Sequence, residues 1–243
     1  MNLLVSDYDG TLFTNENDIL INCRTIEEFI KKGNKFLLSS GRPYDSLKRQ
    51  VEKYKIPYSY LGTSDGNFMF DSNDNLIMEN YMSKKIVRDL EELKKLNIYE
   101  RIQYAYPNTN SEEYKKDSLG SIAFVIKEDK ITSDFTNEYN RLKQENPKYQ
   151  FDIYGYGDTY YYMIRPMGIN KSSPIIHLEK KLNIPKRKIY TIGDNDNDIE
   201  MIKDYNGFMI GNNFELKNVS LKRYDAVHEL INDINKKKVL KRW

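Results

Sequence analysis

The chain opens, after its first two residues, on the stretch Leu3-Leu4-Val5-Ser6-Asp7-Tyr8-Asp9-Gly10-Thr11. The apolar beginning of this stretch predicts a short buried strand. Side chains at i and i+2 of an extended segment leave on the same face, so Asp7 and Asp9 are expected to point together. Open α/β sheets bind ligands at the carboxyl ends of their strands. The stretch therefore predicts a site, although an ordinary Asp-Gly turn is the alternative interpretation.

Strand and helix patterns alternate on both sides of this stretch. Strands that alternate with helices at this pace build βαβ units and a parallel sheet, so we predict an α/β fold with a Rossmann-like core. In the helix after Lys171, the residues Ile175, Ile176 and Leu182 are expected to face inward. The predicted strands are 35–38, 58–61, 189–192 and 207–210, and a small hairpin is predicted from 68–70 and 76–78.

The pattern changes between residues 81 and 165. Ser83 resembles a helix cap and is followed by an apolar stripe at Ile86, Leu90 and Leu93. Strand-like runs between helices indicate an inserted α+β module. We therefore predict a discontinuous core domain of residues 1–80 and 166–243, interrupted by an α+β domain of residues 81–165. The strands predicted in this insert are 102–106, 121–127, 149–154 and 160–165, with a helix near 135–142 and a polar loop at 107–120.

Composition restricts the possible partners and compartments. The chain has 243 residues, of which 39% are hydrophobic and 30% charged, and its net charge is +2. Such a charge balance predicts neither nucleic acid nor a membrane as partner, and no feature indicates an obligate protein partner. A single cysteine, Cys23, allows no internal disulfide. No apolar run approaches the ~20 residues that cross a bilayer, and no signal peptide is recognisable, so a cytoplasmic protein is expected.

A second acidic cluster follows the predicted strand 189–192. It reads Gly193-Asp194-Asn195-Asp196-Asn197-Asp198, which is more acidic than a helix cap requires. Because Asp7 and Asp194 both follow strands of one predicted sheet, they can converge. Mg²⁺ prefers oxygen ligands, so Asp7, Asp194 and the backbone carbonyl of Asp9 are predicted to bind it. Asp198 and Thr11 are predicted to support these ligands from behind.

Further polar residues have the character of phosphate ligands. Ser40 ends the second predicted strand, and Gly41 allows close approach to the backbone. Lys171 offers a positive charge near a helix start. Together with Asn197, these residues are predicted to bind a phosphate group, although each taken alone is also compatible with a turn or a surface position.

The four motifs together resemble those of the haloacid dehalogenase superfamily, in its Cof-like sugar-phosphate phosphatase branch. The first motif corresponds to Asp7-x-Asp9-Gly10-Thr11, and the second to Ser40-Gly41-Arg42. Lys171 corresponds to the third motif, and Gly193-Asp194-x-x-Asn197-Asp198 to the fourth. The insert lies between the second and third motifs, where this branch carries its cap domain. The stretch Ser64-Asp65-Gly66-Asn67 departs from the family, which often has Asn-Gly followed by a small residue.

The resemblance implies a Mg²⁺-dependent phosphatase acting on a small phosphorylated metabolite, with a sugar phosphate as the expected class. It implies that Asp7 is the nucleophile, forming an aspartyl-phosphate. It also implies that Asp9 is the general acid and base. A phosphomutase using the same residues is one alternative, and a non-catalytic metabolite-binding protein on this fold is another. Which substrate is bound, and whether Arg42 contacts it, stays open.

Overall fold

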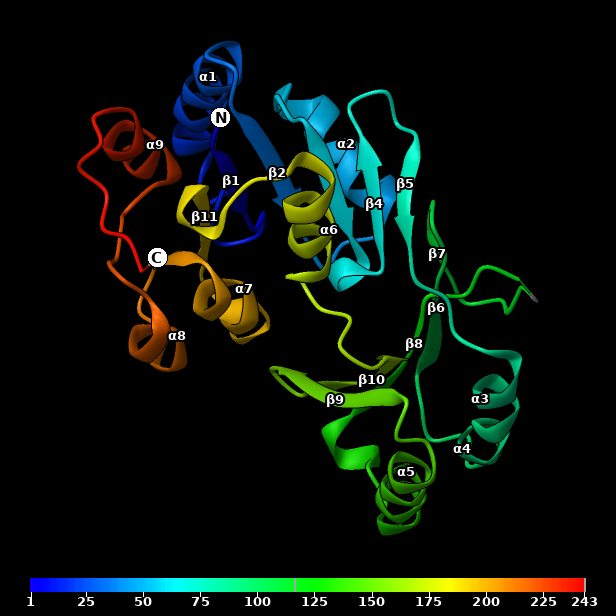
Figure 1. The fold of residues 1–243 in the computed structure, drawn as a ribbon. Helices are drawn as coiled ribbons and strands as arrows, with labels where there is room; N and C mark the ends of the chain where they lie inside the picture. The colour runs from blue at the N-terminus through cyan, green and yellow to red at the C-terminus, as the bar shows by residue number, and fades with distance from the viewer. Residues whose placement is uncertain (116, 243) are drawn as a thin grey trace. The chain divides into compact units, whose positions relative to one another are not determined.

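The computed structural model describes residues 1–115 and 117–242 (Figure 1). The chain divides into two compact units, one formed by residues 1–78 and the chain from residue 170 onward, the other by residues 79–169. We call them the core unit and the insert unit. In the core unit, helices alternate along the chain with strands that form a largely parallel sheet. This confirms the predicted α/β fold.

A seven-stranded sheet forms the centre of the core unit. Its strands are β1 (Leu3–Ser6), β2 (Lys35–Ser39), β3 (Tyr60–Thr63), β4 (Phe68–Asp71), β5 (Leu76–Glu79), β11 (Ile189–Gly193) and β12 (Asn206–Met209). Their order is β12-β11-β1-β2-β3-β4-β5. The pairs from β12 to β3 are parallel, whereas β4 lies antiparallel to β3. Strand β1 therefore lies between β11 and β2, and three predicted motifs leave the same edge of the sheet.

Helices connect these strands. They are α1 (Glu16–Lys31), α2 (Tyr44–Tyr54), α6 (Ser173–Leu182), α7 (Ile199–Asp204), α8 (Phe214–Val219) and α9 (Val227–Asn235), with 3₁₀ turns η1 (Ser64–Gly66), η3 (Lys186–Lys188) and η4 (Asp196–Asp198). The side chain of Asn15 caps α1 by accepting hydrogen bonds from the backbone N–H groups of Asn17 and Asp18, both at 3.0 Å. Helix α1 ends just before Gly33, as its sequence predicts.

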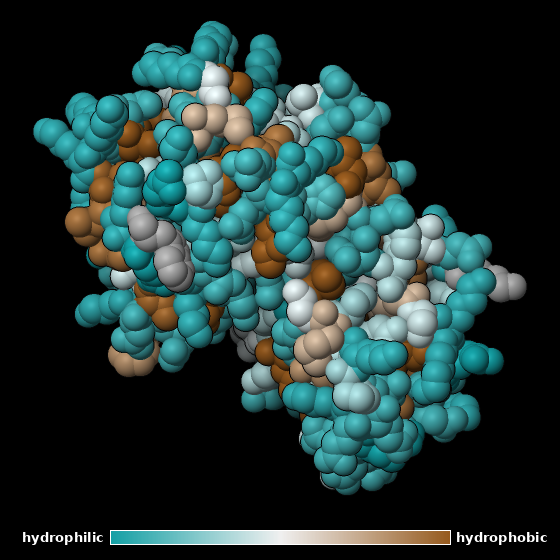
Figure 2. Space-filling view, in the orientation of Figure 1, coloured by the Kyte–Doolittle hydropathy of each residue, from teal (hydrophilic) through white to brown (hydrophobic). Residues whose placement is uncertain are grey.

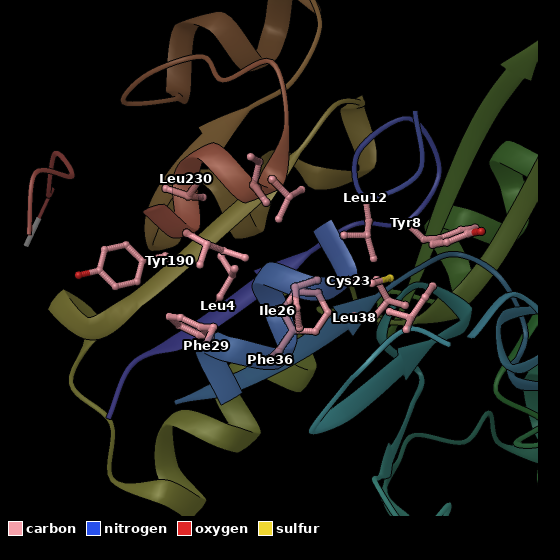
Figure 3. Close-up of a cluster of buried hydrophobic side chains, with 14 of the residues drawn as sticks. Leu4, Tyr8, Leu12, Cys23, Ile26, Phe29, Phe36, Leu38, Tyr190 and Leu230 are labelled. Atoms are coloured by element: carbon pink, nitrogen blue, oxygen red, sulfur yellow. The ribbon is translucent and has the colours of Figure 1, made fainter. Parts of the chain in front are cut away.

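The two faces of the sheet carry separate apolar layers, because successive side chains of a strand point to opposite faces. Leu4 of β1 packs in one layer with Phe36 of β2, Phe29 of α1 and Leu230 of α9 (Figure 3). Leu3 and Val5 lie in the other layer, with α6 and α7. With both faces covered, β1 holds the residues that follow it in a fixed position.

One prediction about helix α6 is wrong. Ile175 is fully buried, but Ile176 is 41% exposed, and Leu178 takes the next inward position. The buried residues of α6 are Pro174, Ile175 and Leu178, so its inward face is centred between Pro174 and Ile175. Ile176 lies about 100° further round the helix and falls outside that face. Leu182 packs partly buried against the same layer.

A separate five-stranded sheet forms the insert unit, in the order β7-β6-β8-β10-β9. Its elements are α3 (Lys84–Asp89), α4 (Glu91–Lys95), β6 (Arg101–Ala105), β7 (Asn110–Ser111), β8 (Ser121–Lys127), η2 (Glu128–Lys130), α5 (Ser133–Glu145), β9 (Tyr149–Tyr156) and β10 (Thr159–Pro166). All its described strand pairs are antiparallel. The region predicted as a polar loop contains the short strand β7, which pairs with β6 and so differs from the prediction.

The insert unit has its own hydrophobic core. Phe135 and Tyr139 of α5 pack against Phe124 of β8 and Tyr162 of β10 in this cluster. Ser83 accepts a hydrogen bond from the N–H of Ile86, as expected of a helix cap. The predicted first helix is divided at Leu90 into α3 and α4.

Polar residues dominate the face of the protein shown in Figure 2, and apolar residues are scattered among them. This agrees with the charged fraction of 30%. Among the described helices, none combines the length and the apolar character needed to cross a bilayer.

Candidate active site

The carboxylates of Asp7, Asp194 and Asp198 meet at the carboxyl edge of the core sheet. Asp7 directly follows β1, and Asp194 directly follows β11, which is paired in parallel with β1. One carboxylate oxygen from each of the three residues lies within 4.8 Å of the others. Residues far apart in the sequence are thus brought together because their strands are neighbours.

Lys171 joins two of these carboxylates. Its ammonium Nζ donates to Asp7 Oδ1 at 2.8 Å and to Asp198 Oδ1 at 2.7 Å, and the side chain is only 2% exposed. Burial opposes the charge on Lys171, but the attraction of Asp198 and Asp7 outweighs it and raises its pKa. Lys171 is therefore a permanent cation beside the predicted nucleophile.

Asp198 accepts hydrogen bonds from three donors, through both of its carboxylate oxygens. Its Oδ1 accepts from Lys171, and its Oδ2 accepts from the N–H groups of Asp194 (3.0 Å) and Asn195 (3.2 Å). Thr11 Oγ1 donates to Asp194 Oδ1 at 2.5 Å. Asp198 and Thr11 thus orient other site residues, whereas Asp7 and Asp194 have capacity for a cation.

The donor set fits a hard divalent cation. Burial raises the pKa of Asp7 well above its usual value, although Lys171 opposes the shift, and burial also raises the pKa of Asp194. These shifts have the direction expected where carboxylates lie close together away from water, Asp7 buried and Asp194 partly buried. Carboxylate oxygens are the ligands that Mg²⁺ prefers, so a cation here would offset their negative charge.

Gly10 allows the first turn to approach the second acidic cluster. Its φ of +77° is favourable for glycine, and a Cβ atom at this position would lie 2.3 Å from Asp194 Oδ2. Any side chain at residue 10 would therefore displace Asp194 or the backbone.

Asp9 forms an ion pair that was not predicted. Both of its carboxylate oxygens accept from the Arg42 guanidinium, Oδ2 from Nε at 2.7 Å and Oδ1 from Nη2 at 2.8 Å. The hydrogen bond to Asp9 raises the pKa of Arg42. The side chain of Asp9 is 53% exposed, so this pair is open to solvent. A bidentate pair fixes the orientation of the carboxylate.

Ser40 presents a hydroxyl group at the end of β2. Ser40 is 1% exposed, and its Oγ accepts from the N–H of Arg42 at 3.1 Å, which leaves the hydroxyl hydrogen for another acceptor. Gly41 follows directly. The segment has the donors that an anion requires.

The fourth predicted phosphate ligand, Asn197, leads to a residue that sequence reasoning missed. Its amide Nδ2 donates to Asp65 Oδ1 at 3.2 Å. Asp65 lies in η1, directly after β3, and is only 8% exposed. Its position after a strand of the same sheet is the signal that could have identified it. All the predicted site residues lie in the core unit, and their roles stay predictions.

Comparisons with known proteins point to one family. Residues 4–110 and 91–219 match the family model described as haloacid dehalogenase-like hydrolase. A 5-amino-6-(5-phospho-D-ribitylamino)uracil phosphatase of Bacillus subtilis is 26% identical over 216 residues, covering 86% of this chain and 84% of the relative.

Solved structures share the fold at low sequence identity. A haloacid dehalogenase-like hydrolase from Bacteroides thetaiotaomicron superposes with a TM-score of 0.77 at 19% identity, covering 96% of this chain and 99% of the other. A sugar phosphatase of subclass IIB of the same superfamily gives a TM-score of 0.74 at 14% identity, with coverages of 97% and 99%.

Proposed function

This chain belongs to the haloacid dehalogenase-like hydrolases and is an enzyme of that family, and we propose that it is a Mg²⁺-dependent phosphatase of a small phosphorylated metabolite. The observation that carries the proposal is the buried contact of Lys171 with Asp7, beside the carboxylates of Asp194 and Asp198. A permanent cation next to a nucleophilic carboxylate suits the transfer of an anionic phosphoryl group.

In the first proposed step, an oxygen of Asp7 attacks phosphorus in line and the bond from phosphorus to the leaving oxygen breaks. Asp9, protonated and released from its pair with Arg42, donates a proton to that oxygen, so an alcohol leaves and an aspartyl-phosphate remains on Asp7. In the second step, Asp9 takes a proton from water, whose oxygen attacks the same phosphorus. The bond to Asp7 breaks, and inorganic phosphate is released.

In this proposal the other site residues bind the phosphoryl group or the metal ion. Ser40, the backbone at Gly41, Lys171 and Asn197 hold the oxygens of the phosphoryl group. Asp7, Asp194 and the backbone carbonyl of Asp9 would hold Mg²⁺. When bound, Mg²⁺ supplies positive charge that offsets the negative charge of the phosphoryl group.

We further propose that the substrate is a sugar phosphate or a related polyol phosphate. Two similar proteins support this class: the Bacillus subtilis relative is a phosphatase of a phosphoribitylamino compound, and one structural neighbour is a sugar phosphatase. A panel of phosphorylated sugars, polyols and nucleotides would identify the preferred substrate by phosphate release. A cytoplasmic location remains a prediction from the sequence.

The first test is hydrolysis of an aryl phosphate with Mg²⁺. Asp7→Asn should lower kcat by about 10³-fold or more, because the amide cannot act as the nucleophile. Asp129→Asn is the matched control, since it changes an exposed carboxylate in η2. Equal rates for Asp7→Asn and the wild type would contradict the nucleophile assignment. In a parallel assay with a sugar phosphate as substrate, isomerised sugar phosphate without free phosphate would indicate a phosphomutase.

Thermal unfolding tests the metal site independently of turnover. Mg²⁺ that binds only the folded state stabilises it by about 2.7 kcal/mol at a concentration of 100 times Kd. We expect Mg²⁺ to raise the Tm of the wild type, and to raise that of Asp194→Asn much less. The same rise in both proteins would show that Asp194 does not bind the ion.

A further inference from the structure

The turn η1 is hydrogen-bonded to Ser40 and Asn197, and it lies close to Gly41 and to the residue that precedes Lys171. The N–H of Asp65 donates to the carbonyl oxygen of Ser40 at 3.2 Å, and the N–H of Ser64 donates to that of Arg42 at 2.9 Å. These bonds attach the turn to the segment that presents the Ser40 hydroxyl and Gly41.

The same turn lies against the backbone that precedes Lys171. A Cβ atom at Gly66, whose φ is +88°, would lie 1.9 Å from the carbonyl oxygen of Asn170. Only glycine permits this approach. The turn is therefore packed between two groups of predicted phosphate ligands, one at Ser40 and one at Lys171.

The side chain of Asp65 extends these contacts. It accepts the hydrogen bond from Asn197 described above, and both its carboxylate oxygens lie within 3.2 Å of where a Cβ atom of Gly41 would be. Asp65 is also one of three carboxylates whose negative charge attracts Lys171. A nearly buried carboxylate is costly unless it is hydrogen-bonded and lies near a positive charge. Asn197 supplies the hydrogen bond, and Lys171 supplies the charge.

Building on the proposed phosphatase function, we propose that Asp65 is a positioning residue that fixes the Asn197 amide against the substrate phosphate. Asn197 has rotatable side-chain bonds, and the hydrogen bond to Asp65 holds its amide group in one orientation.

The backbone of Asp65 determines which variants are informative. Its φ is +50°, a left-handed conformation that glycine and asparagine adopt with little strain. Asp65→Gly therefore removes the carboxylate without straining the turn. Asp65→Asn removes the charge but keeps an oxygen that can accept from Asn197.

The experiment measures aryl phosphate hydrolysis and inhibition by inorganic phosphate for the wild type, Asp65→Gly, Asp65→Asn, Asn197→Ala and the double variant Asp65→Gly with Asn197→Ala. We expect Asp65→Gly to raise KM and the phosphate inhibition constant about tenfold, with kcat changed less than about threefold. Asp65→Asn should restore most of the affinity. The double variant should resemble Asn197→Ala alone, because a positioning residue has no effect once its partner is gone.

Other outcomes would overturn the inference. A loss confined to kcat, with KM unchanged, would mean that Asp65→Gly only reduces the fraction of folded enzyme. Additive effects in the double variant, or a wild-type KM in Asp65→Gly, would show that Asp65 does not act through Asn197. In these cases the wild type still hydrolyses the aryl phosphate ester, so the proposed function stands. A wild type that neither hydrolyses the ester nor binds inorganic phosphate would overturn both proposals.

Discussion

At the scale of single residues, the site shows how a buried charge is compensated. Lys171 and Asp198 are almost completely buried, and such charges are costly unless paired and hydrogen-bonded. Each is paired here, and Asp198 receives two further backbone N–H groups. Removing one member of such a group leaves the others uncompensated. A loss of activity in a variant of Lys171 or Asp198 could therefore come from lost stability as well as from lost catalysis. Arg42 is more informative, because its ion pair with Asp9 is open to solvent.

We predict that Arg42→Gln lowers kcat by about tenfold, because Asp9 loses the bidentate partner that orients its carboxylate to take a proton from water in the second step. Arg42→Lys should be intermediate, since an ammonium keeps the charge but not the planar fork. The Tm should change little, because exposed ion pairs contribute about 0–1 kcal/mol.

Arg49→Gln is the matched control for this prediction. It breaks another arginine-carboxylate pair, with Asp45 on α2, which is also exposed. Wild-type kinetics in Arg42→Gln, measured by initial rates with an aryl phosphate, would show that Asp9 works without this orientation.

At the scale of elements, helix α6 decides where Lys171 lies, because the helix begins just after that residue. Ile175 and Leu178 anchor the helix to the sheet, while Ile176 faces solvent. The prediction that Ile175 and Ile176 both face inward used only their apolar character and did not consider where each points around the helix axis. The inward face of α6 is centred between Pro174 and Ile175, and Ile176 lies about 100° beyond Ile175, outside that face.

We predict that Leu178→Ala lowers the free energy of unfolding by about 2–5 kcal/mol, because it leaves a cavity beneath the helix. Ile176→Ala on the same helix should cost about 0.5 kcal/mol or less, as is usual for exposed positions. Urea unfolding followed by circular dichroism measures both values. Similar losses in the two variants would contradict the orientation of α6.

At the scale of the whole molecule, the two units have separate hydrophobic cores. The core unit contains the two apolar layers on its sheet, and the insert unit contains the cluster around Phe124 and Phe135. We propose that the insert unit corresponds to the predicted cap domain. Among the described residues, no buried residue belongs to the core of both units. A substitution in one core should therefore destabilise mainly its own unit.

We predict that Phe135→Ala, which costs about 3–5 kcal/mol in a core, increases amide hydrogen exchange in residues 79–169. Exchange in β1 and β11 should stay close to that of the wild type. Mass spectrometry of peptides from both units measures the difference. An equal increase in both units would mean that they unfold as one cooperative structure.

The sequence by itself determined the α/β fold, the family and the candidate residues. The periodicity of apolar residues predicts strands and helices, and Asp7, Asp194 and Lys171 stand beside those elements in recognisable motifs. The boundaries of elements were less predictable. Strand β7 lies in a polar stretch where pairing with β6, rather than local pattern, produces the strand.

Only the tertiary structure decided which of these groups touch. Lys171 bridges Asp7 and Asp198, Arg42 pairs with Asp9, and Asn197 reaches Asp65, in each case across a long stretch of sequence. Sequence patterns report which face a side chain takes within its own element. The distance between two elements depends on the order of strands in the sheet and on packing on both of its faces, and these are properties of the folded chain as a whole.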